Sequence, residues 1–299
     1  MDFSGVYPAL TTPFAADGSV SIEGIKHNIA RYNSTGLSGF VAMGSTGESM
    51  LLSHAEWETV LVAVKEAAAP GKRLIAGTGA ESTAETIEKT KRAAQLGYQA
   101  ALVKTPHYYK PAYKPDVLIA HYRRVADASP IPVLLYSVPV FTGITLEAPE
   151  IAVMAQHPNI VGIKDSSGHV LRVGETYAAV PREFQILVGA PATLLASLAV
   201  GARGGILALA SALPELCVAL FDAARNGPLE KARELQVTLL KAAAAIVGEA
   251  GIAGIKFVMD QRGYRGGIPR LPLVPPSDAA KRRMLEALAV LEPVATASR

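Results

Sequence analysis

Two lysines stand within otherwise apolar runs of this sequence, where a charged side chain is costly to bury. Lys104 ends the run Ala-Ala-Leu-Val-Lys, and Lys164 follows Val-Gly-Ile. Loss of hydration disfavours an ammonium group, so burial favours the neutral, nucleophilic amine. Such an amine attacks a ketone to form a Schiff base, whose iminium withdraws electrons from the neighbouring carbon. The pattern predicts carbon–carbon bond chemistry through an imine. Alternatively, both lysines reach solvent or pair with a carboxylate such as Asp165.

Two other groups could assist that chemistry. Residues 44–48 (Gly-Ser-Thr-Gly-Glu) follow an apolar run, and their glycines let the backbone turn tightly. Consecutive N–H groups in such a turn suit a carboxylate, and Ser45 and Thr46 add hydroxyls. Tyr136 ends another apolar run and could pass a proton, although a tyrosine there can also simply fill the core.

Several other chemistries lack their residues. The six histidines are scattered, and no two have metal-ligand spacing on one helix face. The chain has no Gly-x-Ser-x-Gly, no Walker loop and no complete Gly-x-Gly-x-x-Gly. The lone cysteine, Cys217, lies in an apolar stretch and is expected in the core, which fits a reducing compartment. No metal and no cofactor are expected.

Composition predicts a globular protein of the cytoplasm. Half of the 299 residues are hydrophobic, 18% are charged, and the formal net charge is only +3, which excludes a disordered chain. Lysine and arginine are scattered rather than clustered, so no nucleic-acid partner is expected. No uninterrupted apolar run is long enough to span a membrane, and residues 1–5 do not resemble a signal peptide.

The strands and helices that position these residues are predicted from hydrophobic runs. The runs recur about every 20 to 35 residues, with amphipathic segments between them. Continuous apolar runs are typical of parallel strands covered on both faces. Eight strand–helix repeats predict a (β/α)8 TIM barrel, with chemistry at the carboxyl ends of the strands. An open doubly wound sheet is the alternative. The runs are residues 6–10, 39–43, 73–77, 100–103, 131–136, 160–163, 184–188 and 205–209.

After the eighth run the alternation stops, and only helical patterns follow. We therefore predict that residues 1–226 form the barrel with the active site and that residues 227–299 form a helical appendix packed on it. Further upstream, Ser53 and Ser82 are typical helix-starting residues. The predicted C-terminal helices are residues 214–224, 229–247, 252–261 and 277–291.

Taken in order, the motifs resemble those of the dihydrodipicolinate synthase and N-acetylneuraminate lyase family of class I aldolases. The likeness extends from about Phe3 to Leu291. It implies a barrel, a pyruvate site, and a homotetramer built as a dimer of dimers. The motifs are Gly44-Ser45-Thr46-Gly47-Glu48, Thr105-Pro106-His107-Tyr108-Tyr109, Tyr136-Ser137-Val138-Pro139 and Gly162-Ile163-Lys164-Asp165.

The resemblance implies a role for each catalytic position. Lys164 takes the Schiff-base position, and Lys104 has no counterpart in the motif. Tyr136 matches the proton shuttle beside the imine, and the Thr46 hydroxyl joins its relay. Tyr108 matches a tyrosine that the neighbouring subunit contributes to that relay.

Substrate contacts are implied in the same way. Ser45 and Thr46 match residues that hold the keto acid's carboxylate, and Ile206 matches one whose backbone lines the pyruvate pocket. Ser166 is taken as a further substrate contact. Glu48 belongs to its motif but is expected to brace the turn and not to act on the substrate.

Particular positions separate the substrates within the family. Synthases of dihydrodipicolinate usually have asparagine after the motif tyrosine, and an arginine five residues after it that binds the aldehyde's carboxylate. This chain has Ser137 and Phe141 there, so one carboxylate lacks its charge-assisted partner. The sialic acid lyases usually follow the lysine with an aromatic residue, where this chain has Asp165.

Three segments are similar instead to the 4-hydroxy-2-oxoglutarate aldolases: residues 81–83, 126–139 and 157–166. One position departs from those enzymes, which often have asparagine where this chain has Thr46. The resemblance implies metal-free cleavage of a 4-hydroxy-2-oxo acid, with 4-hydroxy-2-oxoglutarate giving pyruvate and glyoxylate as the expected case.

Three alternatives stay open. The first is 4-hydroxy-tetrahydrodipicolinate synthase, which condenses pyruvate with aspartate semialdehyde. The second is an aldolase or dehydratase of keto-deoxy sugar acids. The third is a catalytically silent barrel that binds a keto acid without reacting.

Overall fold

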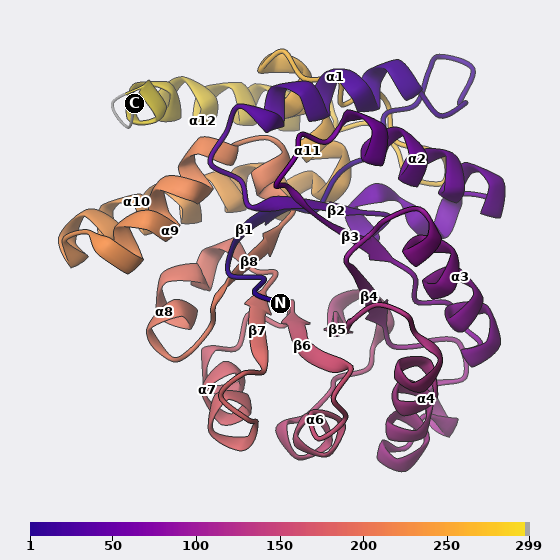
Figure 1. Cartoon of the computed structure of the whole chain (residues 1–299). Coiled ribbons are helices and arrows are strands. Elements are labelled where there is room, and N and C mark those ends of the chain that lie inside the picture. Colours follow the sequence, from indigo (N-terminus) through magenta and orange to yellow (C-terminus); the bar gives the residue numbers. More distant parts are fainter. Residues whose placement is uncertain (297–299) are drawn as a thin grey trace. The chain divides into compact units, whose positions relative to one another are not determined.

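Strands and helices alternate along the chain as the hydrophobic runs predict. The computed structural model describes residues 1–296, with side chains to residue 291. Within this range eight strands belong to one sheet, in the order β1-β8-β7-β6-β5-β4-β3-β2 (Figure 1). The strands are β1 (Gly5–Pro8), β2 (Gly39–Ala42), β3 (Arg73–Gly77), β4 (Ala100–Lys104), β5 (Val133–Ser137), β6 (Ile160–Asp165), β7 (Gln185–Val188) and β8 (Gly204–Leu207).

The helices begin where the capping residues predict. Ser53 accepts a hydrogen bond from the Glu56 N–H, and the Glu56 carboxylate accepts one from the Ser53 N–H, which completes a capping box. Ser82 caps the next helix by accepting from the Glu85 N–H. The helices up to β8 are α1 (Ile22–Asn33), α2 (His54–Ala67), α3 (Thr83–Gln95), α4 (Pro115–Ala128), α5 (Pro139–Thr142), α6 (Ala148–Met154), α7 (Val170–Ala179) and α8 (Leu194–Ala199).

The contacts divide the chain into two compact units. The central unit comprises residues 1–4 and 73–205, and the terminal unit comprises residues 5–72 and the chain from residue 206 onward. The predicted boundary at residue 226 stays a prediction.

The central unit contains β3 to β7, which pair in parallel and in sequence order. Figure 1 shows α3, α4, α6 and α7 along one side of these strands. In the register, Lys104 pairs with Tyr136, and Tyr136 pairs with Lys164. Register partners in a parallel sheet point to the same face. The two lysines and the tyrosine therefore lie on one face, near the carboxyl ends of three neighbouring strands.

The terminal unit shows how the sheet closes. The Leu10 N–H donates to the Val41 carbonyl over 2.9 Å, and the Ala9 N–H donates to the Leu207 carbonyl over 3.0 Å. The first strand thus lies between the second and the last strand, an arrangement that distinguishes a barrel from an open sheet. The (β/α)8 prediction is confirmed, and the doubly wound alternative is wrong.

Helices alone follow β8 in the described part of the chain, as predicted. One continuous stretch, Leu229–Gln261, is long and apolar enough to cross a membrane by composition, with a mean hydropathy of 1.6 over 18 residues, but half of that window is buried. A buried core helix meets the same criterion. The helices are α9 (Pro214–Asn226), α10 (Leu229–Ala243), a π-helical turn (Ala244–Gly248), α11 (Glu249–Gln261) and α12 (Asp278–Thr296).

Candidate active site

Lys164 presents an unpaired amine in the central unit. Its side chain lies on β6 with only 4% of the residue exposed, and its Nζ lies 4.3 Å from the centroid of the Tyr136 ring. The neighbouring Asp165 carboxylate is occupied otherwise, since it accepts the Ser167 N–H over 2.6 Å. No carboxylate within the described residues forms an ion pair with Lys164, so the pairing alternative is wrong for this lysine.

Lys104, in contrast, is paired. Its Nζ lies 3.1 Å from Glu81 Oε1 and 3.3 Å from His107 Nδ1. Burial lowers the pKa of Lys104, and the Glu81 carboxylate works in the opposite direction. The carboxylate alternative is therefore confirmed for Lys104.

Sequence reasoning missed Gly189, which follows β7 and makes room around the Lys164 side chain. A Cβ on Gly189 would lie 3.1 Å from Lys164 Cε and would overlap the Ser166 hydroxyl. Ser166 is half-buried, and its N–H donates to the Ser137 carbonyl over 2.9 Å. The structure thus brings Lys164, Tyr136 and Ser166 together. The signal in the sequence was a glycine directly after a buried strand, a position that the motifs do not include.

Tyr108 is placed differently, because it lies on the exposed segment that follows β4. It is 74% exposed, and its ring meets that of Tyr109 edge-on, with centroids 5.0 Å apart. A role for Tyr108 in a neighbouring subunit stays a prediction.

The terminal unit holds the other predicted site residues. Ser45 and Thr46 form a single 3-10 turn (Ser45–Gly47), and Ile206 is fully buried in β8. In the described chain, the only non-glycine residues with left-handed φ are Met43 (60°) and Glu48 (55°), and they flank this turn. Such strained conformations persist where the surroundings over-determine them and are frequent at functional sites.

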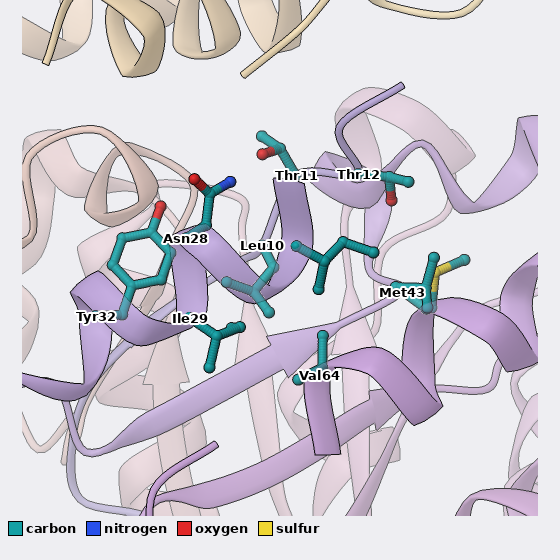
Figure 2. Close-up of a pocket in the computed structure, with 10 residues that line it drawn as sticks. Leu10, Thr11, Thr12, Asn28, Ile29, Tyr32, Met43 and Val64 are labelled. Atoms are coloured by element: carbon teal, nitrogen blue, oxygen red, sulfur yellow. The ribbon is translucent and has the colours of Figure 1, made fainter. Parts of the chain in front are cut away.

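A hydrogen bond from the segment after β1 fixes the turn. Thr12 Oγ1 donates to the Gly47 carbonyl over 2.7 Å. Figure 2 shows Thr12 and Met43 among the residues that line a small cavity of the terminal unit. The cavity encloses about 10 Å³, room for at most a water molecule, so it does not serve as a substrate pocket.

A buried ion pair ties the turn to the C-terminal helices. Lys256 on α11 donates to Glu48 Oε1 over 2.5 Å and to the Ile268 carbonyl over 2.9 Å, and both charged side chains are fully buried. The Arg270 N–H donates to Glu48 Oε2 over 2.8 Å, and the Lys256 amine lies 4.4 Å from the Phe14 ring centroid. Burial lowers the pKa of Lys256, and Glu48 opposes that shift. Glu48 therefore links its own turn to the chain more than two hundred residues away.

Nothing among the described side chains resembles a metal centre. No group of three or more His, Cys, Asp or Glu residues in that part of the chain could hold a metal ion. Cys217 is fully buried, as predicted, and burial raises the pKa of its thiol.

A pH dependence of stability is expected from His121 on α4. Its Nδ1 lies 2.9 Å from Thr83 Oγ1. Burial, and to a smaller extent the nearby Lys104 charge, lowers the pKa of His121 to about 4, while the Glu81 carboxylate raises it. An unfolded histidine titrates near about 6.5. The unfolded chain therefore binds the proton first, and on the order of 3 kcal/mol of stability is lost as the pH falls from about 6.5 to 4.

The measurement is the free energy of unfolding at several pH values in this range. His121→Asn can keep a hydrogen bond to Thr83 without titrating, so its stability should fall less steeply. Equal slopes for the two proteins would contradict the assignment.

Comparison with known proteins covers nearly the whole chain. The dihydrodipicolinate synthetase family matches residues 2–290. A 4-hydroxy-tetrahydrodipicolinate synthase from Exiguobacterium sp. is 39% identical over 286 residues, which are 96% of this chain and 97% of that relative. The enzyme of the same name from Methanothrix thermoacetophila is 36% identical over 287 residues, 96% of each chain.

Solved structures share the fold. A dihydrodipicolinate synthase from Bacillus anthracis superimposes with a TM-score of 0.92 at 25% identity, covering 97% of this chain and 98% of that one. A chloride-inhibited dihydrodipicolinate synthase from Acinetobacter baumannii, complexed with pyruvate, has a TM-score of 0.91 at 31% identity and covers 96% and 98%. The barrel with additional C-terminal helices is therefore the fold of this chain.

Proposed function

Since the chain belongs to the dihydrodipicolinate synthetase family, we propose that it is a 4-hydroxy-tetrahydrodipicolinate synthase, which joins pyruvate to aspartate semialdehyde through an imine on Lys164. Relatives that match 96% of the chain at 36 to 39% identity carry this name. Cleavage of 4-hydroxy-2-oxoglutarate, which the resemblance of three segments to the aldolases implied, becomes the second candidate.

Family membership establishes the reaction class. The chain is an enzyme of the class I, pyruvate-dependent aldolase type, which makes or breaks carbon–carbon bonds. Enzymes of this family use a Schiff-base lysine with pyruvate and no metal.

The observation that carries the assignment to Lys164 is its buried, unpaired amine against the Tyr136 ring. The amine attacks the pyruvate ketone, water leaves, and the imine carbon becomes an electron sink. Loss of a methyl proton gives an enamine, whose carbon attacks the aldehyde. Tyr136 delivers the proton to the alkoxide that forms, with Thr46 and Tyr108 completing the relay. The amino group of the added aspartate semialdehyde then attacks the imine carbon and displaces the Lys164 amine, which closes the ring and frees the lysine.

Binding roles complete the proposal. Ser45 and Thr46 hold the pyruvate carboxylate with hydroxyls and backbone N–H groups, and the Ile206 backbone and Ser166 line the pocket. Tyr108, three-quarters exposed in the single chain, reaches the site of a second copy. A cytoplasmic homotetramer, a dimer of dimers, is the assembly that accompanies these roles.

One observation favours the second candidate, the cleavage of 4-hydroxy-2-oxoglutarate. Phe141, 61% exposed, stands where the synthases usually have the arginine that binds the acceptor's carboxylate. A positive charge nevertheless lies beside this turn. It is the Lys110 amine, which would be 2.9 Å from a Cβ on Gly143. Ser137 carries less weight as a substrate determinant, since it is fully buried and its hydroxyl accepts the Leu146 N–H over 3.3 Å.

A direct comparison of substrates tests the proposal. We expect kcat/KM for pyruvate with aspartate semialdehyde to exceed that for cleavage of 4-hydroxy-2-oxoglutarate, or of a keto-deoxy sugar acid, by about 100-fold. The Lys164→Ala protein measures the background. A larger value for either cleavage would overturn the synthase assignment, and saturable pyruvate binding without any imine would indicate a silent barrel.

A further inference from the structure

The segment that carries Tyr108 is exposed, so its backbone conformation has to be fixed by specific contacts. Residues 108–112 are all exposed, and 3-10 structure is confined there to a single turn, Lys110–Ala112. Ordering an exposed segment costs about 1 to 2 kcal/mol of backbone entropy per residue. A catalytic side chain on this segment therefore depends on local hydrogen bonds for its position.

Glu81 supplies those hydrogen bonds from the connection between β3 and α3. Its Oε2 accepts the N–H groups of two consecutive residues, from His107 over 3.0 Å and from Tyr108 over 2.9 Å. Its Oε1 lies 3.1 Å from Lys104 Nζ and 2.5 Å from His107 Nδ1. Hydrogen bonds to an ionised carboxylate are about twice as strong as neutral ones.

Lys104 fixes the carboxylate in turn. The lysine is almost buried at the end of β4, in register with Tyr136. Gly79 lets the connection approach it closely, because a Cβ on Gly79 would lie 2.5 Å from the Lys104 backbone nitrogen. The lysine that the family motif leaves without a role therefore sets the position of Glu81.

Glu81 is ionised at neutral pH. Burial of the carboxyl opposes ionisation, but the two N–H groups and the Lys104 amine together lower the pKa of Glu81. The hydrogen bonds from the His107 and Tyr108 N–H groups to Glu81, here called the tether, therefore have an ionised acceptor at neutral pH.

We propose that Glu81 is a positioning residue, which holds the backbone of Tyr108 so that this tyrosine can enter the active site. The inference rests on the role of Tyr108 in the proposed function. Glu81 itself does not touch the substrate, because both of its oxygens are engaged by the segment and by Lys104.

Two substitutions at one position separate the tether from the charge. Glu81→Ala removes the one oxygen that accepts both N–H groups, so kcat should fall about 10- to 100-fold, as for Tyr108→Phe. Glu81→Gln keeps an oxygen that can accept both N–H groups and should retain most of kcat. Glu85→Ala is the matched control, since Glu85 lies in the first turn of α3 and forms an ion pair with Lys89, four residues further along that helix.

Amide hydrogen exchange measures the hydrogen bonds to Glu81 independently of activity. The His107 and Tyr108 amides should exchange at least about tenfold faster in Glu81→Ala and not in Glu85→Ala, because hydrogen bonding protects an amide. The double variant Glu81→Ala/Tyr108→Phe should be no slower than the slower single variant, since both changes remove the same contribution. Trapping of pyruvate with borohydride should stay unchanged in Glu81→Ala and in Glu85→Ala.

Each of these readouts can overturn the inference. Unchanged exchange at Tyr108 in Glu81→Ala would exclude the tether. Accelerated exchange with unchanged kcat would exclude a positioning role, and so would additive losses in the double variant. If the unmodified protein trapped no pyruvate, the proposed function would fail, while the exchange experiment would still decide whether Glu81 holds the segment.

Discussion

Replacement of Lys164 by alanine is expected to abolish turnover while the fold stays intact. The amine is the proposed nucleophile, and the other strand-end lysine of the central unit, Lys104, is paired with Glu81, so kcat should fall by on the order of 10⁴-fold or more. The amine has no carboxylate partner among the described residues, so its removal leaves no buried charge uncompensated. Circular dichroism and the unfolding midpoint should therefore change little.

Covalent trapping locates the reactive amine. After incubation with pyruvate and borohydride, the unmodified protein should gain the mass of one reduced pyruvate adduct per chain, and a peptide digest should place it on Lys164. Lys104→Ala is the matched control, because it removes the other strand-end lysine of the central unit and should leave the adduct in place. An adduct on Lys164→Ala, or on Lys104 in the unmodified protein, would refute the mechanism.

Breaking the buried pair between Lys256 and Glu48 is expected to have the largest effect on stability. Lys256→Met leaves the Glu48 carboxylate buried without its cation, which should lower the free energy of unfolding by about 3 to 5 kcal/mol. Because Glu48 ends the turn that carries Ser45 and Thr46, the KM for pyruvate should also rise.

Chemical denaturation measures this loss, and two further variants interpret it. The double variant Lys256→Met/Glu48→Gln removes both charges and should recover part of the stability. Lys26→Met breaks the half-exposed pair with Glu66, whose atoms lie 2.8 Å apart, and should cost less than about 1 kcal/mol. Equal losses for Lys256→Met and Lys26→Met would show that burial of the pair contributes nothing.

Local patterns in the sequence were enough to predict the barrel and the strand ends that carry the candidate site residues. Continuous apolar runs mark strands buried on both faces, and Ser53 and Ser82 mark helix starts, because both signals depend on residues within a few positions of each other. The family motif then selected Lys164 over Lys104. It did not select the acceptor aldehyde, for which the sequence favoured one candidate and the relatives' names another.

Only the tertiary structure decided which charged groups are paired. Glu81 meets Lys104 across 23 positions of sequence, and Lys256 meets Glu48 across 208. Folding alone creates such contacts, and no periodicity records them. For the same reason Gly189 looked like an ordinary turn residue until β6 and β7 placed it against the Lys164 side chain. The sequence by itself determined the scaffold and singled out Lys104 and Lys164 as candidate amines. Packing between distant segments determined that Lys104 pairs with Glu81 and that Lys164 has no carboxylate partner among the described residues.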